Sequence, residues 1–137
     1  MANYYGVAKT NYFKVTDEKK YEELVNNLLA EDEIHDFSCI IDGELKHGFG
    51  SYSAITYCAD DEELLYDLEV FLTELQKILP DGEAFIYQET GYEKLRYVTG
   101  FAYIVTNKTI EWVSLENSIM TKAKELLGKD FKTQLDY

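Results

Sequence analysis

The sequence has few cysteines, one proline and no long apolar run. Its 137 residues include two cysteines, Cys39 and Cys58, and a single proline. No run reaches the roughly 18 consecutive apolar residues that a membrane-spanning helix needs. The first residues lack a basic segment followed by an apolar one, so we expect no signal peptide. Together these absences predict reduced, buried thiols and a cytoplasmic location, with no membrane partner.

Patterns typical of catalysis and of metal binding are also missing. The nearest candidate metal ligands are His35, Asp36, Cys39 and His47, but their spacing matches no established zinc pattern. No feature of the sequence marks either cysteine as an activated nucleophile. We therefore expect no catalytic residue, no metal and no cofactor, and we expect that the protein is not an enzyme.

Basic residues are scarce, and the charge is unevenly distributed. Lys and Arg number 13 against 26 Asp and Glu, a net charge of −13. The segment 17–89 holds 20 acidic and four basic residues, a net charge of −16, whereas residues 1–16 carry +2 and residues 90–137 carry +1. Such a charge repels nucleic acid and anionic lipid and attracts a basic partner. The alternative interpretation is that these carboxylates simply face water.

The segment Asp60–Leu79 is the most strongly patterned part of the chain and predicts a helix that ends at Pro80. Asp60 or Asp61 is suited to cap its start. Apolar residues recur at three- and four-residue spacings, which predicts one buried face; they are Leu64, Leu68, Phe71, Leu72, Leu75, Ile78 and Leu79. Its outward side carries seven carboxylates and one lysine. The predicted helix is therefore strongly negative.

The remaining pattern predicts short strands and two further helices. Asp42-Gly43 is the strongest hairpin signal. Thr16 is suited to cap a helix that ends near the acidic loop 31–33. The last helix is predicted at 115–127, with Gly128 as its stop and with an inner face made by Ile119, Ala123, Leu126 and Leu127. Strands are predicted at 11–15, 37–41, within 45–57, at 83–88, 95–106 and 109–113.

This order of elements predicts one α+β domain spanning residues 1–137. We expect a mostly antiparallel sheet with the helices packed on one face. The first six elements are compatible with a ferredoxin-like βαββαβ unit, followed by extra strands and a C-terminal helix.

The acidic segment predicts a binding surface for a basic protein. Carboxylates on a rigid helix can present negative charge much as a nucleic-acid backbone does, and a groove built to hold phosphates can accept them. The predicted surface consists of Glu31, Asp32, Glu33, Asp60, Asp61, Glu62, Glu63, Asp67, Glu69 and Glu74. The segment 45–52 is the predicted source of aromatic anchors beside it.

The opening segment Ala2–Val15 resembles the start of small proteins carried by bacterial phages and mobile elements. The short, acidic, α+β character of the chain is similar to that of anti-CRISPR and anti-restriction inhibitors. This resemblance implies a protein of the bacterial cytoplasm that inhibits a host defence protein, such as a CRISPR effector. Because of its negative charge, we expect that the protein does not itself bind nucleic acid.

Two alternatives remain open at this point. An immunity protein that neutralises a basic toxin nuclease would use the same attraction between acidic residues and a basic surface, with a different target. A small enzyme or ligand-binding domain would instead have a pocket on the tyrosine-rich sheet.

Overall fold

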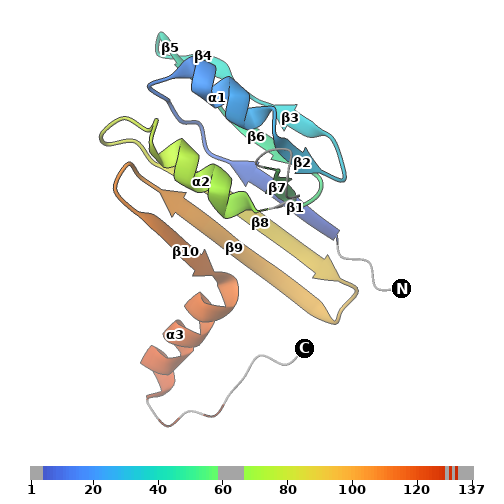
Figure 1. Cartoon of the computed structure of the whole chain (residues 1–137). Coiled ribbons are helices and arrows are strands. Elements are labelled where there is room, and N and C mark those ends of the chain that lie inside the picture. Colours follow the sequence, from blue (N-terminus) through green and yellow to red (C-terminus); the bar gives the residue numbers. More distant parts are fainter. Residues whose placement is uncertain (1–4, 59–66, 129, 131, 133–137) are drawn as a thin grey trace.

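A computed structural model describes residues 5–58, 67–128, 130 and 132 of the chain (Figure 1). In chain order the elements are β1 (Tyr5–Thr10), α1 (Glu18–Val25), β2 (Leu28–Ala30), β3 (Ile34–Asp36), β4 (Cys39–Ile41), β5 (Glu44–Lys46), β6 (Phe49–Ser51), β7 (Ile55–Tyr57), α2 (Leu68–Gln76), β8 (Phe85–Glu93), β9 (Tyr97–Val105), β10 (Ile110–Ser114) and α3 (Leu115–Leu127). The fold is α+β, as predicted. No helix in the described part of the chain is long and apolar enough to cross a bilayer.

Six strands form the main sheet, in the order β10-β9-β8-β1-β6-β3. The first strand is central, because β1 pairs with β8 on one side and with β6 on the other. Two smaller sheets, β2-β7 and β4-β5, complete the strand pairing. All the strand pairs between the described residues are antiparallel. The ferredoxin-like alternative is therefore wrong, because it requires parallel strands joined by helical crossovers.

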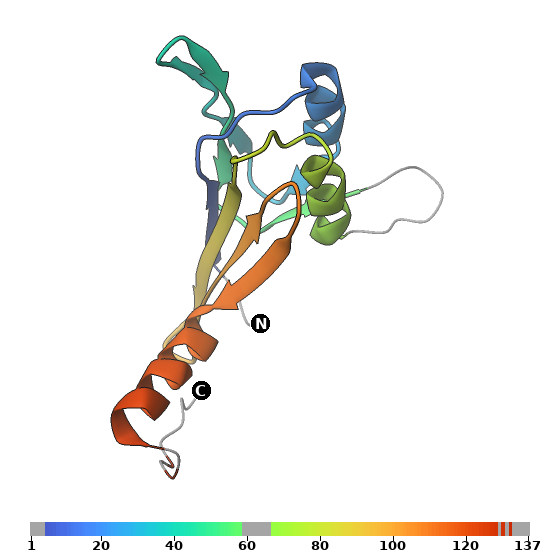
Figure 2. The same cartoon turned by 90° about the vertical axis from the view of Figure 1, so that its left-hand side faces the viewer.

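Helices α1 and α2 lie on the same face of the main sheet (Figure 2). The core lies between them and the sheet, where Phe13, Phe71 and Phe85 are completely buried. The rings of Phe13 and Phe85 meet edge to face, with centroids 4.9 Å apart. The apolar stripe predicted for α2 is confirmed, since Phe71, Leu72 and Leu75 have no exposed surface.

The first strand lies earlier in the chain than the sequence predicted. The segment predicted as a strand, 11–15, contributes only an isolated bridge between Phe13 and His47. Residues 5–10 form β1 instead, because their alternating side chains match β8 in register, from Tyr5 opposite Tyr92 to Thr10 opposite Tyr87. The predicted strand at 37–41 is likewise only β4, whose Cys39 is exposed. The expectation that Cys39 is a buried core thiol is therefore wrong.

The two acidic helices begin later than predicted. Asp17, not Thr16, caps α1, because its side chain accepts a hydrogen bond from Lys20 N–H. Asp67 caps α2 in an extended conformation and accepts from Glu69 N–H at 2.9 Å. A helix cannot run through an extended residue, so α2 starts at Leu68 and not near Asp60. The predicted caps Asp60 and Asp61 lie outside the described residues.

Helix α3 has the predicted boundaries but not the predicted packing. It begins after Ser114 and ends at Gly128, whose φ of 88° suits glycine. None of its residues is buried, and it projects from the end of β10 away from α1 and α2 (Figures 1 and 2). The predicted inner face, which includes Leu126 and Leu127, is therefore not covered by the sheet.

Candidate acidic interface

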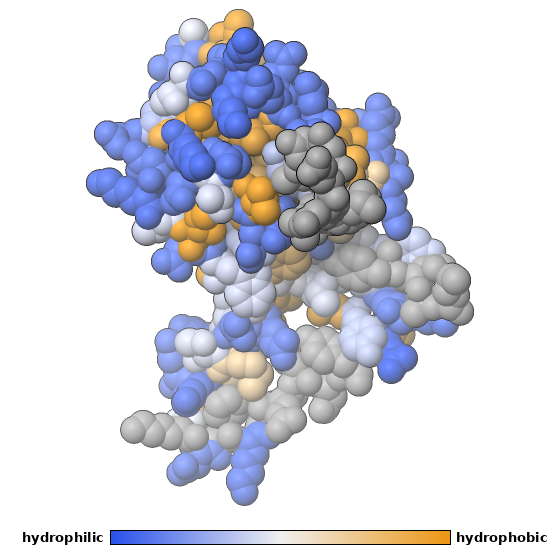
Figure 3. All heavy atoms as spheres, viewed as in Figure 1, coloured by the Kyte–Doolittle hydropathy of each residue, from blue (hydrophilic) through white to orange (hydrophobic). Residues whose placement is uncertain are grey.

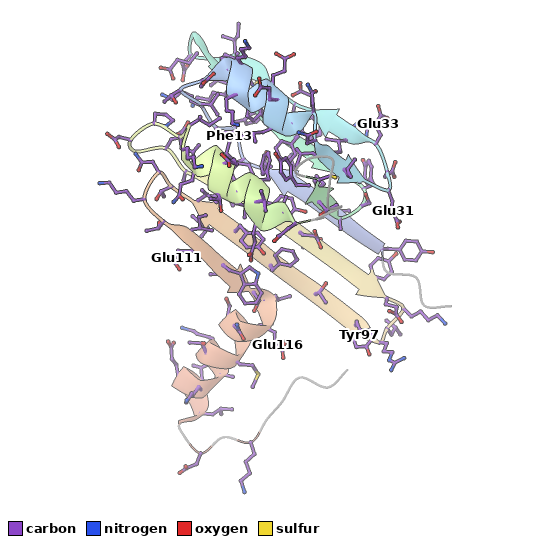
Figure 4. All side chains as sticks on the ribbon, in the orientation of Figure 1. Phe13, Glu31, Glu33, Tyr97, Glu111 and Glu116 are labelled. Atoms are coloured by element: carbon purple, nitrogen blue, oxygen red, sulfur yellow. The ribbon has the colours of Figure 1, made fainter. Side chains whose placement is uncertain are left out.

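The turn between β2 and β3 carries three of the ten predicted binding residues. Glu31, Asp32 and Glu33 are all exposed there. The turn is held by two hydrogen bonds: Asp32 N–H donates to Ser53 Oγ, and Glu33 N–H donates to Asp32 Oδ1. Figure 4 places Glu31 and Glu33 beside β2 and β3, far from Glu116 on α3. The turn therefore has a defined backbone from which three exposed carboxylates project.

Three more predicted residues lie on α2, and each has a local role. Asp67 is the helix cap, and Glu74 lies 3.2 Å from Lys77 Nζ in an ion pair. The pKa of Tyr103 is raised by burial, and next by the negative charges of Glu69 and Asp67. The prediction that these carboxylates all lie on the outward side of one helix is therefore wrong in part, since Asp67 precedes α2 and Glu74 is half-buried. The other four predicted residues, Asp60, Asp61, Glu62 and Glu63, lie outside the described residues.

Helix α1 contributes acidic residues that the sequence-based prediction omitted. Glu22 and Glu23 are exposed on it. Glu23 also lines a groove of about 300 Å³ between α1 and α2, together with Lys20 and Glu74. The sequence contained the necessary signal, because Glu22 and Glu23 fall outside the apolar stripe of the predicted helix. Hydrophilic residues dominate the surface around α1 (Figure 3). We define the acidic interface as Glu22, Glu23, Glu31, Asp32, Glu33, Asp67, Glu69 and Glu74.

No family model, curated protein or solved structure matches this chain.

The side chain of His47 is buried and lies at the centre of a partly exposed polar network that resembles a catalytic triad. His47 Nε2 is 2.6 Å from Glu18 Oε2, and His47 Nδ1 is 3.1 Å from Ser38 Oγ. The ring stacks on Tyr21, with centroids 4.1 Å apart. Such a serine–histidine–carboxylate chain could activate a nucleophile if the histidine accepted the serine proton.

The hydrogen bonds of Ser38 argue against that role. Its hydroxyl donates to Asp36 Oδ1 at 2.5 Å, and its N–H donates to the same oxygen at 2.8 Å. These two bonds are the main cause of the lowered pKa of Asp36, so this carboxylate is ionised and can only accept. A hydroxyl has one proton, and Ser38 gives it to Asp36, so the serine does not donate it to His47 Nδ1. The arrangement therefore lacks the serine-to-histidine hydrogen bond through which a triad activates its nucleophile.

The candidate metal ligands do not come together. His35 stacks against Phe37, with ring centroids 6.4 Å apart, whereas His47 is held by Glu18 and Ser38. Within the residues that the structure describes, no three His, Cys, Asp or Glu side chains converge on one point. Both cysteines are free thiols.

The face of the sheet opposite α1 and α2 has two adjacent pockets. Exposure alternates along β1: Val7 and Lys9 are exposed, whereas Ala8 and Thr10 are buried. Val7 and Lys9 line both pockets, of about 270 and 470 Å³. The smaller pocket has aromatic walls, and Lys9 Nζ lies 5.5 Å from the ring centroid of Phe37. This face differs from the acidic interface, because its central charged group is a lysine.

Proposed function

We propose that this protein is a non-enzymatic inhibitor that occupies the basic nucleic-acid-binding surface of a bacterial defence protein, such as a CRISPR effector. The observation that carries the proposal is the acidic interface, in which α1, α2 and the β2–β3 turn present exposed carboxylates within a segment of net charge −16. The partner it fits is a protein with a groove lined by Lys and Arg.

Rigid placement of the charges supports this function. Leu24 of α1 and Phe71 of α2 are buried in the same core, so the two helices have fixed positions relative to the sheet. Carboxylates carried on a fixed backbone can satisfy a groove that normally binds phosphates, without the entropic cost of ordering the segments that carry them. Glu22, Glu23, Glu31 and Glu33 are the strongest contributors, because Glu74 is already paired with Lys77.

A second candidate function follows from the pockets on the opposite sheet face. A small planar or aromatic ligand would find ring surfaces at Phe37 and Tyr52 and a cation at Lys9. This arrangement supports a ligand-binding domain of the kind left open by the tyrosine-rich sequence. The two functions are separable, because they use opposite faces of the sheet.

The test compares two triple variants that change the net charge equally. Glu23→Lys/Glu31→Lys/Glu33→Lys reverses the acidic interface, and Glu111→Lys/Glu125→Lys/Asp130→Lys reverses exposed carboxylates elsewhere. Each tagged protein is used to capture partners from a bacterial lysate at about 0.1 M and about 1 M NaCl, where the screening length falls from about 10 Å to about 3 Å. Wild-type protein should capture the partner at low salt and lose it at high salt. At low salt the first variant should fail to capture the partner, whereas the second variant should still capture it.

Competition with nucleic acid then decides the mechanism. The purified partner is mixed with its own DNA or RNA and with increasing amounts of this protein. The interface variant should bind the partner at least about tenfold more weakly than the control variant, because close charge pairs across an interface couple by about 1.5–7 kcal/mol. Equal affinities for the two variants, or a ternary complex with nucleic acid, would contradict the proposal.

A further inference from the structure

Helix α3 presents an apolar surface that the described part of the chain does not cover. At 3.6 residues per turn, its apolar side chains fall on one side of the helix, within an arc of about 140° around the helix axis. They are Leu115, Ile119, Met120, Ala123, Leu126 and Leu127. None is buried, and Leu126 and Leu127 are 74% and 63% exposed. We call these six residues the α3 arc.

A helix of this length needs packing to be stable. The 13 residues of α3 lie in the range where an isolated helix is marginal in water, even when it is well capped. Its first turn is anchored on the sheet, because Leu115 Cβ lies 3.4 Å from where a Cβ on Gly100 would be. Beyond that turn, the α3 arc supplies the apolar surface on which the missing packing would form.

The apolar surface continues into a pocket at the base of α3. This pocket has a volume of about 410 Å³, and its walls include Leu95, Val98, Trp112, Leu115 and Ile119. Leu95 is fully exposed and Val98 is 59% exposed. The α3 arc and this pocket form one contiguous apolar surface, with the pocket at the N-terminal end of the helix and Leu126 and Leu127 at the other.

The charges around this surface favour a second copy of the same chain as its occupant. Two copies each carrying −13 repel one another, but α3 carries two lysines and two glutamates and is neutral. It also projects away from the helices of the acidic interface (Figure 2). Association through α3 therefore keeps the two acidic regions apart.

The positions of the charges also select the orientation. Glu116 lies in the first turn of α3 and Lys124 in the last. When two such helices run antiparallel with Met120 near the two-fold axis, Glu116 of each copy lies level with Lys124 of the other. A parallel arrangement would place Glu116 beside Glu116, which is repulsive.

We propose that the protein is a homodimer in which two α3 helices pack antiparallel through the α3 arc. In this arrangement Leu126 and Leu127 of each copy reach the end of β10 in the other copy, where the 410 Å³ pocket opens. Each copy therefore supplies both the apolar tip and the pocket that receives it. The interface is isologous and closes on itself, as in most soluble homodimers.

Sedimentation equilibrium of the full chain tests the proposal directly. Wild-type protein should have about twice the 15.9 kDa mass of one chain. Leu126→Glu should weaken dimerisation at least about a hundredfold, because the two-fold symmetry places Leu126 in the interface twice and each dimer loses the burial of both side chains. Thr121→Glu is the matched control, since Thr121 lies on the polar side of the same helix and is exposed. Leu126 is mostly exposed in a single chain, so its replacement should leave the monomer folded.

Charge exchange tests the orientation. Glu116→Lys and Lys124→Glu should each weaken the dimer. The double variant should restore it, because residue 116 of each copy then again lies level with an opposite charge at residue 124 of the other. A mass of one chain at every concentration up to about 1 mM, beyond which association is weak, would overturn the proposal and leave the surface to a different protein. A dimer that Leu126→Glu leaves unchanged, or a double variant weaker than either single variant, would also overturn it.

Discussion

Tyr21 is the residue whose environment has the clearest consequence for pH dependence. Burial raises its pKa, and the negative charges of Asp36 and Glu18 raise it further. An unfolded tyrosine ionises near pH 10, whereas folded Tyr21 stays neutral at that pH. The unfolded state therefore releases its proton first, so the stability that Tyr21 provides is complete below about pH 10 and is lost as the pH rises further.

The measurement is the urea midpoint at about pH 8 and about pH 10.5. Wild-type protein should lose stability between these values, and Tyr21→Phe should lose less because it cannot ionise. Tyr103 has a raised pKa as well, so some loss should remain in the variant. Identical losses in the two proteins would mean that Tyr21 ionises as easily when folded as when unfolded.

Asp36 gives the opposite dependence at acidic pH. Its pKa is lowered, first by the hydroxyl and N–H of Ser38 and also by the nearby His47. Its contribution to stability is therefore present above the usual pKa, near 3.9, and is lost as the pH falls through the lower folded value.

Replacing Ser38 tests this assignment. Ser38→Ala removes the hydroxyl bond, so the pKa of Asp36 should rise toward its usual value in an NMR titration of the carboxyl group. Ser53→Ala is the control, because the Ser53 hydroxyl accepts a hydrogen bond from Asp32 and not from the Asp36 network. A shift in the control but not in Ser38→Ala would contradict the assigned cause.

At the scale of elements, the start of α2 is the most informative difference between expectation and structure. Asp67→Ala should cost about 0.5–2 kcal/mol of stability, because the cap to Glu69 N–H is lost. Asp67→Asn should keep most of that stability, since asparagine caps a helix about as well. Urea denaturation of the three proteins measures both effects. A large loss in Asp61→Ala, with none in Asp67→Ala, would instead place the start of the helix where the sequence pattern did.

Elements fixed by local chemistry could be predicted from the sequence. The Asp42-Gly43 hairpin formed because both residues adopt positive φ, 53° and 79°, as its tight turn requires. The boundaries of α3 follow from a serine cap and a glycine stop. The buried side of α2 follows from its three- and four-residue spacing.

Elements fixed by distant partners could not be predicted in this way. The choice of residues 5–10 over 11–15 as the first strand depends on pairing with β8, far along the chain. The apolar pattern of α3 indicates that one side of the helix should be buried, but it does not identify the surface that covers that side. In the acidic interface, exposure of the β2–β3 turn was predictable from its composition. The pairing of Glu74 with Lys77 and the capping role of Asp67 depend on the helix geometry.

For the whole molecule, the uneven charge makes stability depend on salt. Twenty acidic residues within segment 17–89 repel one another in the folded state. Raising NaCl from about 0.01 M to about 0.15 M shortens the screening length from about 30 Å to about 8 Å. The free energy of unfolding should therefore rise over this range. The variant Glu23→Lys/Glu31→Lys/Glu33→Lys should show a smaller rise, and a fall with salt in wild-type protein would mean that attractive pairs outweigh the repulsion.

The central position of β1 also determines the order in which the sheet can form during translation. During translation β1 leaves the ribosome before its partners. It pairs with β6 on one side, but its other neighbour, β8, is made only when residues 85–93 have been added. Until then one edge of β1 has no strand beside it. The hairpins β8-β9 and β9-β10 join neighbouring segments and can form quickly, whereas the β1–β8 pairing must close a loop of most of the chain. We therefore expect the non-local β1–β8 contact to slow folding of the sheet, as in other proteins of high contact order.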